Sequence, residues 1–265
     1  MRVTTVAVSV LVGALVFSGC SAASEPNPQL PAPQRLRVEV LEARAHDQTA
    51  FTQGLELAGG ALYEGTGLVG ASTLREVDPV SGTVRRRVDV PSGYFGEGIT
   101  VVGDSIWQLT WQDGVAIKWR RGDFSQERTA EYKGEGWGLC HDGSRLVMSD
   151  GSGTLTFRDP ATFAERGRLA VRRADAEVTR LNELECAGGA VWANVWQTDE
   201  ILRIDPATGA VTAVVDASRL LPEAQRNGAD VLNGIAAVPG TEEFLLTGKL
   251  WPSLFRVKFV PVRQN

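Results

Sequence analysis

One pattern of apolar and polar residues repeats five times along this chain. In each copy a polar or aromatic residue precedes a short apolar strand, a turn containing glycine follows, and a second apolar strand ends in polar or aromatic residues. The copies begin at Gln53, Glu97, Trp137, Glu183 and Asn233, at intervals of 44, 40, 46 and 50 residues. A period in the forties made of short strands is the size of one propeller blade. The pattern therefore predicts an all-β fold, a five-bladed β-propeller.

Outer strands follow these pairs and also repeat. Three segments alternate apolar residues and then run into a turn that contains Asp or Asp-Pro: Leu74–Gly82 (LREVDPVSG), Leu155–Phe163 (LTFRDPATF) and Leu202–Gly209 (LRIDPATG). This is the chemistry of a strand that ends in a tight hairpin. Helix signals are scarce, and the best is a short turn from Ser218 to Arg226.

The last repeat lacks a fourth strand. Its three strands lie near Asn233, Phe244–Thr247 and Leu254–Val260, after which the chain stops. The N-terminal segment Leu36–Ala43 (LRVEVLEA) alternates like a strand and has no repeat of its own. We expect it to join the last blade and close the ring, which removes an open sheet edge. A β-sandwich is the alternative, but it would not explain five spaced repeats.

The N-terminus has the features of an export signal. Arg2 precedes the apolar run Val6–Phe17, and Ser18-Gly19-Cys20 follows. The run is about 12 residues, whereas a spanning helix needs about 20. The segment resembles a lipobox, which would make Cys20 a lipidated N-terminus at the extracytoplasmic face of the membrane. A cleaved signal with an incidental cysteine is the alternative, since Phe17 is not the preferred residue three positions before the cut.

These features divide the chain into three parts. Residues 1–19 are expected to be a signal peptide, and residues 20–34 the lipidated cysteine with a disordered, proline-rich spacer. Residues 35–265 are expected to form a single five-bladed propeller that is the catalytic domain. Without the signal, 26 basic residues remain against 32 acidic ones, and no basic run occurs, which argues against a nucleic-acid partner. The two histidines, His46 and His141, are not in a ligand-spaced cluster, so no catalytic zinc site is indicated.

One end of a propeller channel is the usual place for a site. The residues that begin the five repeats form a ring there and are all polar or aromatic. Further side chains gather where the second strands end, at Trp111, Trp196 and Lys249. Trp107, Trp119 and Trp192 fall in the middle of strands instead and are expected in the core.

Eight segments resemble the sequence blocks of the plant and bacterial glutaminyl cyclases. In order they are FTQGL (Phe51–Leu55), YFGEG (Tyr94–Gly98), LTW (Leu109–Trp111), GEGWGL (Gly134–Leu139), LNELE (Leu181–Glu185), VWANVW (Val191–Trp196), DVLNGIA (Asp230–Ala236) and TGKLWP (Thr247–Pro252). The resemblance covers about residues 47–260. It implies a propeller enzyme that closes the N-terminal glutamine of peptides or proteins into pyroglutamate and releases ammonia.

The resemblance also implies roles for single residues. Glu97 matches the family's essential carboxylate. The residues that match its pocket are Phe51, Gln53, Phe95, Trp111, Trp137, Asn182, Trp196 and Lys249. Cys140 and Cys186 match no family pattern. They occupy related positions in adjacent inner strands, so a disulfide is allowed after export, unless their Cα atoms lie more than about 7 Å apart.

The chemistry of cyclisation agrees with these roles. The neutral α-amine attacks the glutamine's own carboxamide, and a proton must reach the departing ammonia. One carboxyl, Glu97, can accept that proton and deliver it, and aromatic walls would raise its pKa and hold the glutamine folded. Asn182 or Lys249 could donate to the developing oxyanion, typically worth about 3 kcal/mol. The sequence leaves the choice between them open.

Two other functions compete with the cyclase. A calcium-dependent propeller lactonase would hold its metal through side-chain oxygens, which five residues could supply: Glu64, Glu97, Asn182, Glu183 and Asn233. A non-enzymatic propeller that binds a protein is the second. The tryptophans favour an apolar amide pocket over a hydrated cation. The cyclase interpretation requires no cofactor for catalysis, is compatible with a structural calcium, and has the membrane as a partner through the lipid anchor.

Overall fold

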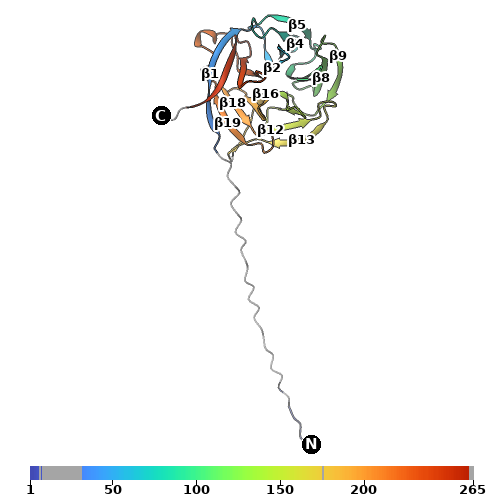
Figure 1. Ribbon diagram of the computed structural model, residues 1–265. Helices are drawn as coiled ribbons and strands as arrows, with labels where there is room; N and C mark the ends of the chain where they lie inside the picture. Colours follow the sequence, from blue (N-terminus) through green and yellow to red (C-terminus); the bar gives the residue numbers. More distant parts are fainter. Residues whose placement is uncertain (6, 8–31, 175, 263–265) are drawn as a thin grey trace.

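The computed structural model describes residues 1–5, 7, 32–174 and 176–262 (Figure 1). Cys20, all but one residue of the apolar run of the export signal, and most of the spacer therefore lie outside the described residues. Within the described part, no helix has both the length and the apolar character needed to cross a membrane. The fold is all-β, and the single helical element among these residues is the 3-10 turn η1 (Glu223–Gln225), inside the predicted turn.

Three sheets have four antiparallel strands each, joined in chain order. The first contains β2 (Thr52–Ala58), β3 (Ala61–Thr66), β4 (Thr73–Val77) and β5 (Val84–Asp89). The second contains β6 (Gly96–Val102), β7 (Ser105–Thr110), β8 (Val115–Arg120) and β9 (Gln126–Glu131). The third contains β10 (Leu139–His141), β11 (Leu146–Met148), β12 (Thr154–Arg158) and β13 (Glu165–Ala170). A short hairpin of β14 (Arg172–Arg173) and β15 (Ala176–Glu177) follows.

The remaining strands form one eight-stranded sheet in the order β16-β17-β18-β19-β1-β22-β21-β20. Their bounds are β16 (Leu181–Ala187), β17 (Ala190–Val195), β18 (Glu200–Ile204), β19 (Val211–Asp216), β20 (Leu232–Ala237), β21 (Glu243–Gly248), β22 (Ser253–Pro261) and β1 (Gln34–Ala45). β1 runs antiparallel to β22, which confirms that the N-terminal strand joins the C-terminal strands. It also pairs in parallel with β19, a contact that the sequence pattern did not predict.

The innermost strands close a ring. β2 contacts β6, β6 contacts β10, β10 contacts β16, β16 contacts β20, and β20 returns to β2. Figure 1 shows the sheets arranged around this centre, with β1 and the last strands side by side. The architecture is propeller-like.

Aspartate side chains end the third strand of three sheets. The carboxylate of Asp78 accepts hydrogen bonds from the backbone N–H groups of Val80 and Ser81. Asp159 makes the same bonds with the two corresponding N–H groups of its own turn, and Asp205 makes one of them. These side chains satisfy turn donors that no strand pairs with. The predicted hairpins after these strands are therefore present.

The innermost strands approach so closely that glycine is needed where they meet. A Cβ on Gly54 would lie 2.5 Å from the backbone nitrogen of Ile99, and one on Gly98 would lie 2.6 Å from the carbonyl oxygen of Trp137. A bulge precedes this contact, because pairing is interrupted between Gly96 and Ile99 in β6. The residue in front of each glycine is therefore turned toward one end of the ring.

The bulges correct one prediction about the ring. In β16 the interruption lies between Leu181 and Leu184, so Asn182 is the equivalent of Glu97. Glu183 takes the place that glycine holds in the neighbouring strands. The repeat pattern had assigned Glu183 to the ring position, an error of one residue that arose because this repeat lacks the marker glycine.

Apolar side chains fill the space between neighbouring sheets. Trp107, Trp119 and Trp192 are buried there, as predicted, and Trp107 packs against Phe163 with ring centroids 4.9 Å apart. Cys140 of β10 and Cys186 of β16 form a disulfide, with Cα atoms 5.4 Å apart. The bond ties together two sheets that also meet through packing and through hydrogen bonds such as that from Ser149 Oγ to the backbone oxygen of Asn182, and it decides between the two alternatives for these cysteines.

We expect Cys140 and Cys186 to be unreactive in the oxidised protein. After denaturation without reductant, peptides containing either cysteine should escape alkylation by iodoacetamide, and reduction should make both reactive. Replacing both by alanine should lower the free energy of unfolding by about 4 kcal/mol, because the crosslink closes a long loop in the unfolded chain. Alkylation of both cysteines before reduction would contradict the disulfide.

Candidate active site

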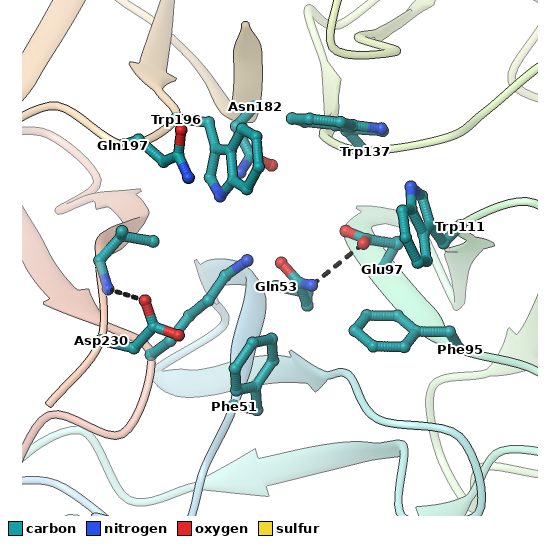
Figure 2. Close-up of a pocket in the computed structure, with 12 residues that line it drawn as sticks. Phe51, Gln53, Phe95, Glu97, Trp111, Trp137, Asn182, Trp196, Gln197 and Asp230 are labelled. Atoms are coloured by element: carbon teal, nitrogen blue, oxygen red, sulfur yellow. Dashed lines mark hydrogen bonds between the residues drawn. The ribbon is translucent and has the colours of Figure 1, made fainter. Parts of the chain in front are cut away.

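A cavity of ≈ 390 Å³ opens at one end of the ring (Figure 2). All nine side chains predicted for the site line it: Phe51, Gln53, Phe95, Glu97, Trp111, Trp137, Asn182, Trp196 and Lys249. They come from the starts of the innermost strands, from the residues just before these strands, and from the residues that follow the second strands. All of these reach the same end of the ring because the two strands of each pair are antiparallel.

Aromatic rings form the walls. Phe95 packs against Phe51 and Trp111, with centroids 6.1 and 5.6 Å apart. On the other side Trp137 and Trp196 meet edge to face at 5.5 Å. The Trp137 ring has space because residue 151 is glycine, where a Cβ would lie 2.6 Å from the indole. These walls make the cavity apolar and hold its shape.

Glu97 is the buried carboxyl of the cavity, with 5% of its surface exposed. Its Oε1 accepts a hydrogen bond from Nε2 of Gln53 at 3.0 Å, while Oε2 has no partner among the described residues. Burial raises the pKa of Glu97 well above its usual value of 4.5, the positive charge of Lys249 opposes this, and the negative charge of Glu135 adds to it. Glu97 therefore holds a proton more readily than an exposed glutamate does.

A hydrogen-bond chain orients the Gln53 amide. Nδ2 of Asn233 donates to the backbone oxygen of Thr52 at 3.0 Å and to Oε1 of Gln53 at 3.2 Å. With its oxygen engaged by Asn233, the Gln53 amide directs its NH₂ group toward Glu97. The polar residue of the fifth repeat thus acts on the site through Gln53 and does not itself line the cavity.

Two nitrogen-bearing side chains complete the polar part of the cavity. The Lys249 amine lies 4.8 Å from the centroid of the Phe51 ring. Burial lowers its pKa, and the charges of Glu97 and Asp230 oppose that shift. Asn182 is buried, and its Oδ1 has no partner among the described residues. Both side chains carry N–H donors that can face an oxygen in the cavity.

Glu135 holds two of the wall tryptophans. Its Oε2 accepts hydrogen bonds from the indole nitrogens of Trp111 at 2.8 Å and Trp137 at 2.9 Å, and its Oε1 accepts one from Gln112 at 2.9 Å. Burial would raise the pKa of Glu135, but these hydrogen bonds lower it. The group is therefore a carboxylate that fixes two indoles and places a negative charge near Glu97.

Two of the carboxyl groups proposed for a calcium site, those of Glu64 and Glu183, have other partners. Oε1 of Glu64 accepts hydrogen bonds from Thr52 and pairs with His46. Glu183 accepts the backbone N–H groups of Leu55 and Ile235. Across the described residues, no group of three or more His, Cys, Asp or Glu side chains is arranged to hold a metal.

Four residues of the site were not singled out from the sequence. Gln197, Asp230 and Val231 also line the cavity, and Glu135 supports it from behind. Asp230, Val231 and Glu135 belong to the blocks DVLNGIA and GEGWGL, so their position in these blocks was the available signal. Gln197 directly follows Trp196, and only its place in the structure reveals it.

The fold and cavity define a class of protein: a propeller-like all-β protein whose aromatic pocket encloses one buried carboxyl. A sequence model described as glutamine cyclotransferase matches residues 11–259. The chain belongs to the glutamine cyclotransferase family.

Individual relatives agree with this assignment. The chain is 40% identical over 226 residues to a glutaminyl-peptide cyclotransferase of Arabidopsis thaliana, covering 83% of this chain and 71% of that protein. The crystal structure of Myxococcus xanthus glutaminyl cyclase superposes with a TM-score of 0.81 at 40% identity, covering 87% of this chain and all of that one.

Proposed function

We propose that this protein is a glutaminyl-peptide cyclotransferase in which Glu97 moves the proton. The activity is that of the family and of the relatives that cover most of the chain. The observation that carries the assignment of Glu97 is its position: a buried carboxyl with one unpartnered oxygen, inside an aromatic cavity. The ring is described best as five blades, because five innermost strands follow one another around it.

The reaction needs a group that both takes and returns a proton. The α-amine of the substrate attacks the side-chain carbonyl carbon, and ammonia leaves from the same carbon. Oε2 of Glu97 accepts the proton of the attacking nitrogen and delivers it to the departing one, so the carboxyl returns to its starting state. The raised pKa brings its proton affinity closer to that of the nitrogen groups it serves.

The other pocket residues stabilise the developing negative charge and orient the substrate. The N–H donors of Asn182 and Lys249 face the oxygen that becomes negative when the amine attacks. The rings of Phe51, Phe95 and Trp196 hold the glutamine side chain folded toward its own amine. No cofactor enters these steps.

The sharpest test compares two substitutions in the cavity. Glu97→Gln should keep the fold and most of the peptide binding but lose turnover by roughly 10²- to 10⁴-fold, because an amide cannot accept and return a proton. Trp196→Ala should raise the Michaelis constant as well as slow the reaction, because the ring orients the substrate. Ammonia release from a peptide with N-terminal glutamine measures both.

The assay is run with and without EDTA, beside thermal melts of each variant. Activity that EDTA abolishes would favour the calcium-dependent alternative, and failure to release ammonia would favour a binding protein. If Glu97→Gln retains more than about a tenth of wild-type turnover with an unchanged melt, Glu97 is not the shuttle.

The pH profile tests the link between Glu97 and Glu135. Turnover should fall on the acid side as Glu97 becomes protonated, at a pH above 4.5, its usual pKa. Glu135→Gln removes a negative charge that raises the pKa of Glu97, so this limb of the kcat profile should move to lower pH. Glu131→Gln, on the outermost strand β9, is the matched control and should leave the limb in place. An unmoved limb in Glu135→Gln would refute the electrostatic link.

We also propose, from the N-terminal sequence, that the enzyme is a lipoprotein on the extracytoplasmic face of the membrane. Replacing Cys20 by alanine should release it from the membrane fraction with cyclase activity retained, because the spacer separates anchor and catalytic domain. Stable attachment takes two or more acyl chains. Fractionation followed by immunoblotting measures the distribution. A wild-type protein found in the soluble fraction would show that Cys20 is not an anchor.

A further inference from the structure

A second cavity of ≈ 350 Å³ adjoins the active-site cavity. The two share Gln197, Asp230 and Val231 as lining residues. In Figure 2 Gln197 and Asp230 lie on the side of the active-site cavity opposite Glu97. The second cavity therefore begins at the end of the active-site cavity that lies away from Glu97.

The second cavity has an apolar floor and a charged rim. The floor consists of Ala217, Leu221, Leu232 and Trp251, all buried. The rim consists of Asp199, Arg226 and Asp230, all exposed. This combination matches a side chain with an apolar stem and a polar end.

The rim has negative charge in excess. Nε of Arg226 pairs with Glu223 at 3.3 Å, and its NH2 group donates to the backbone oxygen of Ser218. The guanidinium charge is thereby offset, while Asp199 and Asp230 remain. The positive charge of Lys249 lies near Asp230 and offsets part of its negative charge. Asp199 is therefore the rim carboxylate that is most available to pair with a cation.

We infer that this second cavity binds the residue that follows the N-terminal glutamine, and that it favours lysine or arginine there. This inference rests on the proposed function. The glutamine that cyclises must keep its amine and carboxamide at Glu97, so its backbone carbonyl leads the chain away, past Asp230 and Val231. The stem of the second side chain then covers the apolar floor, and its cationic end meets Asp199.

The test uses three peptides of equal length that begin Gln-Lys, Gln-Leu and Gln-Glu, with glutamine amide as a substrate that has no second residue. We expect kcat/KM to decrease in the order Lys, Leu, Glu, mostly through KM. Asp199→Asn should lower the ratio for the lysyl over the leucyl peptide by about two- to fivefold, the effect of one exposed ion pair. Asp199→Lys should reverse the preference between the lysyl and glutamyl peptides.

Asp104→Asn removes the same charge from the turn between β6 and β7, at the opposite end of the ring, and should leave all ratios unchanged. Equal kcat/KM for the three peptides, or an unchanged ratio in both Asp199 variants, would overturn the second-residue site. Absence of ammonia release from all three peptides and from glutamine amide in the wild type would instead refute the proposed function, so the two failures are distinguishable. Asp199 is exposed, and its replacement leaves the core intact.

Discussion

The close approach of the innermost strands is the constraint on which the rest of the structure depends. At Gly54 and Gly98 neighbouring backbones come too near for any side chain. The bulges at these contacts turn the preceding residues toward one end of the ring. Side chains that lie more than a hundred residues apart in sequence, such as Gln53 and Asn182, therefore line one cavity. The pocket is a consequence of how the ring closes.

Closure of the ring also buries polar atoms of the site, and this lowers the free energy of unfolding. Oε2 of Glu97, Oδ1 of Asn182 and Oδ1 of Asn233 are buried without partners among the described residues. Each unsatisfied buried polar atom costs about 1–3 kcal/mol, and the burial of Glu97 opposes its ionisation. Structures retain such groups where function needs them. The disulfide and the packed tryptophans between sheets supply stability elsewhere in the molecule.

A cluster of three further carboxyl side chains lies within the ring, away from the active-site end. Glu183 and Glu185 of β16 are buried there, and burial raises the pKa of both, with a contribution from the charge of Glu56. Glu56 is also affected, and burial raises its pKa to about 7. Backbone N–H groups of neighbouring strands bond to Glu56 and Glu183. The side chains of Glu56 and Glu183 therefore connect neighbouring innermost strands.

The sequence by itself determined the repeat architecture and nine of the residues that line the cavity. Strand alternation and Asp-Pro turns are local properties, so five repeats and the closing strand β1 could be predicted from residues near one another in the chain. The nine pocket residues followed from block resemblance, and all nine line the cavity. Only the tertiary structure decided that Asn182 and not Glu183 holds the ring position, because a bulge is defined by its pairing partner. It also revealed the Cys140–Cys186 disulfide, the hydrogen bonds from two indoles to Glu135, and the second cavity. Each of these depends on distances between residues from different strands, and the pattern along a chain contains no such distances.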